Sequence, residues 1–300
     1  MVRKFMDPPR WSEEELKADR SEALGRFTEL RREEGPRTFS RTFDELRPLV
    51  ENALSVSRDL RQVEGDIFRS DPAIWQVFRY VCGPPISQED LWTLVEGPKF
   101  RRVPAAFADA TASAIRDVID PVRFPWVAAG RDPSAEERSA AILATTVLWS
   151  AQMLGTSRRG EASLRQENAT AAALAQAGFD LAPSRNAIEV LDELERGTYS
   201  RERKVAGAKC DVPARLRDGR LLALECKVSN GPKNGWKRVI REVGGKADGW
   251  RQSFGNQVLT AVVLAGVFDL SCLRSAQDNG VILFWEHNLS PLADFVGAAE

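Results

Sequence analysis

The chain has 300 residues, which is enough for one large domain or two of ordinary size. Since 43% of the residues are hydrophobic and 28% are charged, we expect a packed core rather than a disordered chain. The net charge of −1 excludes a protein that binds nucleic acid through its bulk charge, so any such binding needs local basic patches. The single histidine, His287, argues against HNH nucleases and against zinc enzymes that need several histidines.

Cysteine spacing and the apolar segments indicate where the protein works. None of the four cysteines forms a CxxC pair, which argues against a structural zinc site and favours reduced thiols. The first residues, MVRKFMDPPRWSEEE, contain no apolar stretch typical of a signal peptide. The uncharged segment 139–157 includes Ser150 and Gln152, so we interpret it as a buried helix and not as a membrane span. We therefore expect a cytoplasmic protein.

Residues 1–155 have the patterns of helices. Ser12 followed by Glu15 is a capping-box pattern that begins a helix over 12–34, and Gly35-Pro36 is expected to end it. Proline and glycine separate the further helices. These are predicted over about 41–64, 72–81, 87–96, 105–119 and 134–154.

The pattern changes near residues 156–161, and residues 156–300 combine helices with strands. Two strands, joined by a hairpin at Arg217-Asp218-Gly219, precede the uncharged run VLTAVVLAGVF and the run VILFWEH, both typical of buried strands. The predicted strands are 204–216, 220–228, 258–268 and 281–287, and the predicted helices are 162–177, 185–196, 235–243 and 290–298. The chain is thus expected to be an α/β (α+β) protein with a helical N-terminal region and a C-terminal mixed central sheet flanked by helices.

The clearest candidate site is Asp211 with Glu225 and Lys227. Glu225 and Lys227 alternate within the apolar strand LLALECKV, so both side chains lie on one face, where burial is costly unless the charges are paired or bind metal. If the hairpin has a three-residue loop, Asp211 lies opposite Glu225, and two facing carboxylates suit a divalent cation. A cross-strand ion pair remains the structural alternative. A two-residue turn, or a bulge at Pro213, would place Asp211 on the other face.

Asp211…Glu225-Cys226-Lys227 resembles the signature of the PD-(D/E)xK nuclease superfamily, although Cys210 stands where that name has a proline. The longer segments CDVPARLRDGRLLALECKVSN, QVLTAVVLAGVFDL and GVILFWEHNLSPL resemble the XamI-like type II restriction endonucleases. The resemblance implies an αβββαβ restriction-endonuclease-like core at 156–300. It implies that Mg²⁺ is bound by Asp211, Glu225 and the Cys226 carbonyl, and that Lys227 orients or activates the attacking water.

The resemblance also implies a glutamate on the helix before the sheet. Glu167 fits, because it shares a helix face with Leu164, Ala171 and Leu174 and would assist through the outer shell of the metal. A glutamate that turns to solvent is the alternative. The segment after the site is locally basic and fits a phosphate-contacting patch, or else a solvated helix face. Its expected DNA-binding residues are Lys233, Asn234, Lys237, Arg238 and Arg241.

From this resemblance we expect a magnesium-dependent, sequence-specific endodeoxyribonuclease that cleaves double-stranded DNA within a restriction-modification system. Residues 1–155 would supply DNA recognition and dimerisation. The partners implied are a second copy in a symmetric homodimer and a cognate DNA methyltransferase. Two alternatives stay open: a structure-specific repair or recombination nuclease of the same superfamily, and a non-catalytic DNA-binding module with a decayed site.

Overall fold

The computed structural model of the chain describes residues 5–184 and 186–299, except for the side chains of residues 158 and 159. The chain divides into two compact units: residues 34–157 form one, and residues up to 33 together with those from 158 onward form the other. The boundary expected from the sequence lay between residues 155 and 156. The residues before Glu34, which were assigned with the helical region, belong to the unit that contains the sheet.

The unit of residues 34–157 is built from helices around a large aromatic core. Trp75, Phe78, Phe124 and Trp126 are among its fully buried side chains. Its helices are α2 (Gly35–Val56), α3 (Gly65–Ser70), α4 (Trp75–Phe78), α5 (Gln88–Leu94), η2 (Ala105–Phe107), α6 (Ala108–Asp117), α7 (Pro125–Ala129) and the first part of α8 (Ala135–Gln176).

The first predicted helix begins as expected, but its predicted end is wrong. Ser12 and Glu15 form the full capping box at the start of α1 (Glu13–Glu29). At the other end, the π-helical segment η1 (Leu30–Glu34) leads directly into α2, with Pro36 in the first turn of that helix. Pro36 has no backbone N–H and cannot make the hydrogen bond of a regular α-helix. The wider π-helical turn before it does not require that bond, so the helical backbone continues.

Helix α8 replaces two predicted helices, so the break predicted at 156–161 is wrong. Gly155 and Gly160 lower the helix propensity by about 1 kcal/mol each, but the segment contains no proline to interrupt the hydrogen bonds. The uncharged segment 139–157 was expected to be buried, and only one side of it is, since Leu143 and Val147 are exposed. None of the helices over residues 5–184 and 186–299 is long and apolar enough to cross a membrane.

The second unit contains a six-stranded mixed sheet in the order β1-β2-β5-β6-β7-β8. β2, β5 and β6 pair antiparallel, whereas β6, β7 and β8 run parallel. The predicted α/β fold is therefore confirmed and is consistent with a restriction-endonuclease-like core. Its strands are β1 (Asp180–Leu181), β2 (Thr198–Tyr199), β5 (Val212–Arg215), β6 (Leu221–Asn230), β7 (Val258–Val267) and β8 (Val281–Trp285).

Two segments differ from the predicted elements. The helix predicted over 185–196 is wrong, because the Glu193 carboxylate accepts hydrogen bonds from the backbone N–H groups of Glu189 and Val190 and holds them outside a helix. Within residues 186–196 the only helical turn is the 3₁₀ turn η3 (Leu191–Glu193), and residue 185 lies outside the described residues. The predicted strand 204–216 is divided, since Ala206-Gly207 turns with positive φ between β3 (Arg203–Val205) and β4 (Ala208–Cys210).

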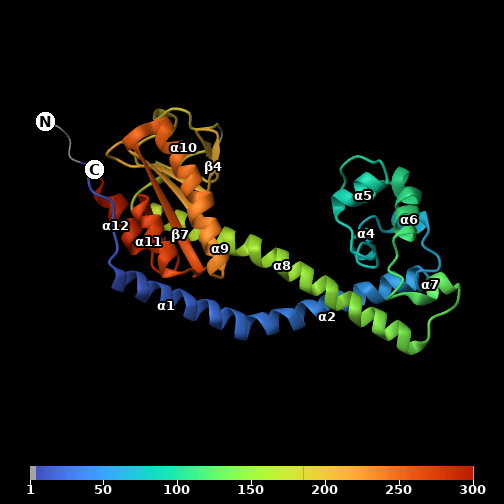
Figure 1. The fold of residues 1–300 in the computed structure, drawn as a ribbon. Coiled ribbons are helices and arrows are strands. Elements are labelled where there is room, and N and C mark those ends of the chain that lie inside the picture. Colours follow the sequence, from blue (N-terminus) through green and yellow to red (C-terminus); the bar gives the residue numbers. More distant parts are fainter. Residues whose placement is uncertain (1–4, 185, 300) are drawn as a thin grey trace. The chain divides into compact units, whose positions relative to one another are not determined.

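Helices cover both faces of the sheet, as Figure 1 shows. On one face, α8 and α12 (Ser290–Ala298) contribute residues such as Leu174 and Phe295 to a core with the strands. On the other face, the core includes Leu16 of α1, Val239 of η4 (Lys237–Val243) and Leu273 of α11 (Leu270–Asp278). The remaining helical segments are α9 (Pro232–Trp236), α10 (Gly244–Phe254) and η5 (Gly255–Gln257).

Candidate active site

The hairpin of β5 and β6 sets the register of the predicted site. Val212 pairs with Leu224, and the backbone N–H of Leu216 donates to the carbonyl of Arg220, so the loop has three residues. Gly219 has φ of 98°, the left-handed conformation that the loop requires. Asp211 directly precedes β5, and continuing the same register places it opposite Glu225. This is the register expected for a three-residue loop, and Pro213 introduces no shift.

Glu225 and Lys227 share the face of the sheet that α1, η4 and α11 cover. Their partners on β7, Val262 and Leu264, belong to the apolar core on that face. The Glu225 side chain is 0% exposed and that of Lys227 is 11% exposed, so both charges are removed from water. Cys226 lies on the opposite face, and burial raises the pKa of its thiol to about 12. Cys226 is therefore a neutral core side chain.

The Lys227 ammonium joins the two carboxylates. Its Nζ lies 2.7 Å from Glu225 Oε2 and 3.1 Å from Asp211 Oδ2, so these two oxygens are at most about 5.8 Å apart, the sum of the two contacts. Asp211 Oδ2 also accepts a hydrogen bond of 2.8 Å from the Cys226 backbone N–H. Burial disfavours the charged form of Lys227, but Glu225 and Asp211 outweigh it and raise the pKa of the lysine. The site thus already places one cation between two carboxylates.

A second lysine, which the sequence analysis did not single out, reaches the same carboxylate. Lys246 of α10 donates to both Glu225 oxygens, at 2.8 and 2.7 Å. Its side chain is 26% exposed. Lys246 lies within the basic segment after the site strand, but the sequence offers no signal that separates it from the neighbouring lysines and arginines.

The helical segment that carries Lys246 is longer than predicted, and a row of residues four apart forms its buried side. α9, η4 and α10 follow one another without a break over 232–254, instead of the predicted 235–243. The buried residues Gly235, Val239, Val243 and Ala247 are four apart, a spacing that the π-helical turn of η4 keeps on one face. A regular helical period would group Trp236 with Val239 and Val243 on the core side, but its side chain is 40% exposed.

Gly235 explains why Trp236 is displaced. A Cβ at residue 235 would lie 2.7 Å from Cδ1 of Phe268, so only a glycine lets the helix approach the core this closely. The next residue, Trp236, then points about 100° away from the contact.

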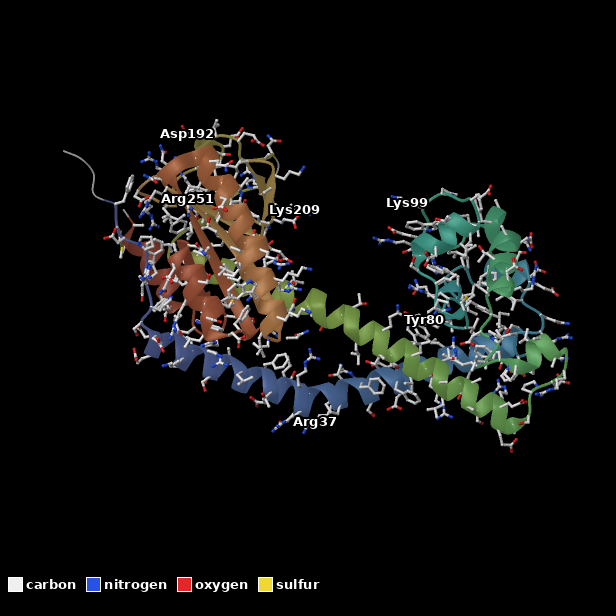
Figure 2. The ribbon with its side chains drawn as sticks, viewed as in Figure 1. Arg37, Tyr80, Lys99, Asp192, Lys209 and Arg251 are labelled. Atoms are coloured by element: carbon white, nitrogen blue, oxygen red, sulfur yellow. The ribbon has the colours of Figure 1, made fainter. Side chains whose placement is uncertain are left out.

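The predicted DNA-binding residues lie on the outer side of the same helical segment. Lys233, Lys237 and Arg241 are exposed, whereas Asn234 and Arg238 are half-buried. Within residues 5–184 and 186–299, none of the four basic side chains forms an ion pair. Their charges are therefore not neutralised by acidic side chains of this part of the chain. In contrast, Lys209 of β4, labelled in Figure 2, forms an ion pair with Glu202.

Glu167 lies on α8, half-buried, within the electrostatic field of the site. Burial raises the pKa of its carboxyl, and the nearby carboxylates of Asp211 and Glu202 raise it further, while Arg201 and Lys227 act in the opposite direction. The Arg201 guanidinium also donates to the Glu167 backbone carbonyl at 3.1 Å. The structure thus brings Glu167 near Asp211 and Lys227, and adds Glu202 as a further acidic neighbour.

The remaining side chains that could bind a metal ion are the acidic, cysteine and histidine residues outside this pair of carboxylates. Over the described ranges, 5–184 and 186–299, the structure contains no group of three or more histidine, cysteine, aspartate or glutamate side chains arranged to hold a metal ion. A cation at the site would therefore rely on two carboxylates and on backbone or water oxygens. The single histidine, His287, contacts Asp19 at 3.2 Å, a structural hydrogen bond outside the candidate site.

Comparison with known proteins adds a sequence relationship to this geometry. The profile of the XamI restriction endonuclease family matches residues 58–285, which include Asp211, Glu225, Lys227 and Lys246. The chain is also 31% identical over 264 residues to the type II restriction enzyme XamI of Xanthomonas campestris pv. amaranthicola, covering 83% of this chain and 93% of that protein. No solved structure is significantly similar.

Proposed function

The chain belongs to the XamI restriction endonuclease family, and we propose that it is a type II enzyme that cleaves double-stranded DNA at specific sites with Mg²⁺. The observation that carries this proposal is the convergence of Asp211 and Glu225 on one ammonium group, that of Lys227, on a buried face of the sheet. Two carboxylates and a lysine in this relation suit metal-assisted hydrolysis of a phosphodiester.

The donor groups fit a divalent cation. The Asp211 and Glu225 carboxylates already face one positive charge, and hard cations prefer such oxygen ligands. The Cys226 N–H points to Asp211, and the carbonyl of a strand residue points to the same edge as its N–H, so the Cys226 carbonyl is the third protein donor we propose. When bound, Mg²⁺ would supply a Lewis acid for the phosphodiester.

The side chains would divide the remaining tasks. The raised pKa of Lys227 keeps it an ammonium group at neutral pH, so it can donate hydrogen bonds to the attacking water or to the phosphate as negative charge develops. Glu167, with its raised pKa and its place near Asp211, would act through water at the edge of the metal site. These roles assign Asp211, Glu225, Lys227 and Glu167 to the catalytic centre.

The outer side of the helical segment 232–254 is the DNA-contacting surface we propose. It carries Lys233, Asn234, Lys237, Arg238 and Arg241, which follow the site strand directly. Basic side chains without acidic partners are available to phosphates. Trp236 lies among them with an exposed indole, a side chain that favours desolvated interfaces.

The class of enzyme extends the proposal beyond the catalytic site. A type II enzyme that cuts a palindromic sequence acts as a symmetric homodimer, and we propose that the helical unit, residues 34–157, contributes recognition and dimerisation surface. The protein would act in the cytoplasm, with a cognate DNA methyltransferase that protects the host sequence as its functional partner.

Incubation of the protein with unmethylated plasmid DNA and Mg²⁺, with and without a chelator, tests the function. We expect discrete fragments that require the metal. A nonspecific smear would favour the repair or recombination nuclease, and intact DNA under all conditions would favour a non-catalytic binding module.

A further inference from the structure

The buried carboxylate of Glu225 forms ion pairs with two lysines, Lys227 and Lys246. Both of its oxygens are hydrogen-bonded to Lys246, and one of them also contacts Lys227. The side chain is 0% exposed, so water contributes nothing to its solvation. Two ammonium groups therefore balance the two carboxylates of the site, Asp211 and Glu225, before any metal binds.

The two lysines hold Glu225 in different ways. Lys227 forms an ion pair with a single oxygen of Glu225 and also donates a hydrogen bond to Asp211. Lys246 contacts both oxygens at nearly equal distances and contacts no other acidic side chain in the described ranges, so it fixes the plane of the carboxylate. Of these two lysines, only Lys246 has Glu225 as its single acidic partner in the described ranges.

The helix that carries Lys246 is firmly attached to the sheet unit. Ala247, the next residue, is buried, and so is Trp250, whose indole N–H donates to the Val205 carbonyl at 2.9 Å. The π-helical turn of η4 precedes α10 and keeps the buried residues four apart, which sets the direction in which residue 246 leaves the helix. The packing of α10 on the sheet unit therefore holds the Lys246 ammonium group beside Glu225.

We propose that Lys246 is a positioning residue of the active site: it orients the Glu225 carboxylate and carries its countercharge, so that Lys227 can leave Glu225 and serve the phosphodiester. This inference rests on the proposed function for the role of Lys227, but the contact between Lys246 and Glu225 can be tested without DNA. In a protein without Lys246, Lys227 is the remaining ion-pair partner of Glu225, and it stays bound there.

The first test uses Ca²⁺ alone and measures thermal unfolding of wild type, Lys246→Met and Lys246→Arg. Lys246→Met leaves a buried carboxylate short of one positive charge, so the variant should unfold at a lower temperature and should gain more from Ca²⁺. We expect the rise in unfolding temperature on adding Ca²⁺ to be at least about 2 °C larger than in wild type. Lys246→Arg, which keeps the charge and can donate to both oxygens, should respond like wild type.

The second test measures single-turnover cleavage in Mg²⁺ together with DNA affinity in Ca²⁺. Lys246→Met should lower the cleavage rate roughly 10- to 100-fold, as expected for a residue that orients a metal ligand, and should leave the affinity unchanged because the basic outer side is intact. Lys246→Arg should recover most of the rate. Lys17→Met is the matched control: it removes an exposed lysine from its ion pair with Glu13 and should change neither measurement.

The outcomes separate this inference from the proposed function. An active wild type whose Lys246→Met variant cleaves normally and responds to Ca²⁺ no more than wild type would overturn the role of Lys246 alone. A wild type that cuts no DNA would overturn the proposed function and the role of Lys246 with it. If Lys246→Met does not fold, Lys246→Gln replaces it, and a glutamine variant as active as the arginine variant would contradict the need for charge.

Discussion

Removing the charges of Lys237, Arg238 and Arg241 together tests whether the outer side of helical segment 232–254 contacts DNA. Lys237 and Arg241 are exposed, Arg238 is half-buried, and none of the three has an acidic partner in the described residues. All three are at least 10 residues after Lys227 and contact neither site carboxylate. The triple alanine variant should therefore bind every DNA sequence more weakly without changing the catalytic groups.

The size of the effect follows from the number of charges. Each phosphate contact contributes about 0.9 to the slope of log affinity against log salt, so three lost contacts lower the slope by about 2.7. Between 50 and 200 mM salt, wild type should thus lose about 40-fold more affinity than the triple variant. Fluorescence anisotropy of a labelled duplex, titrated in Ca²⁺ at several salt concentrations, measures both slopes.

A matched control removes three exposed basic side chains that already have acidic partners: Arg10, Lys17 and Arg26. Because neighbouring acids neutralise these charges, their loss should leave the salt slope nearly unchanged. Equal slopes for wild type and for the triple variant at 237, 238 and 241 would refute the reasoning, and the phosphate contacts would then have to come from other arginines.

Three further predictions concern stability, pH and an aromatic contact. Gly266→Ala should lower the free energy of unfolding in a denaturant titration by at least about 2 kcal/mol, since φ is 90° there and a Cβ would lie 2.1 Å from the Ser229 carbonyl oxygen. Gly245→Ala, where a Cβ meets open space, should raise the free energy of unfolding by about 0.5–1 kcal/mol. Because folding raises the pKa of the Glu167 carboxyl, the stability of wild type relative to Glu167→Gln should fall as pH rises above 4.5 and should not vary with pH below it, as measured by urea unfolding at several pH values. Trp236→Ala should weaken DNA binding roughly tenfold without lowering the unfolding temperature, and an unchanged dissociation constant would exclude the contact.

Local sequence signals predict the sheet around the site well. The apolar runs predict β7 and β8 because strands buried on both faces need no polar residues, and Arg217-Asp218-Gly219 predicts the hairpin between β5 and β6. With a three-residue loop Asp211 lies opposite Glu225, but a two-residue turn or a bulge at Pro213 was equally compatible with the sequence. The register of β5 and β6 decides between them, because it depends on backbone pairing that residue types do not fix.

Lys246 and Trp236 could not be placed from the sequence, because both depend on how a helix packs on the sheet. The 3.6-residue period favours Trp236 as a core residue, but the closest approach uses Gly235, which carries no hydrophobic signal. The π-helical turn then changes the face that each later residue occupies. Likewise, the 42-residue length of α8 contradicts local glycine signals, because tertiary packing outweighs propensity differences of about 1 kcal/mol.

The single-turnover cleavage rate of Lys227→Ala in Mg²⁺, compared with its DNA affinity in Ca²⁺, tests the central claim most directly. Lys227 lies between the two carboxylates, whereas the proposed phosphate contacts lie on the outer side of the helical segment. We predict that cleavage falls by at least about 100-fold while the dissociation constant changes less than about threefold, because the lost interaction acts on the transition state. A variant that cleaves at the wild-type rate would contradict the assignment of Asp211, Glu225 and Lys227 as the catalytic centre.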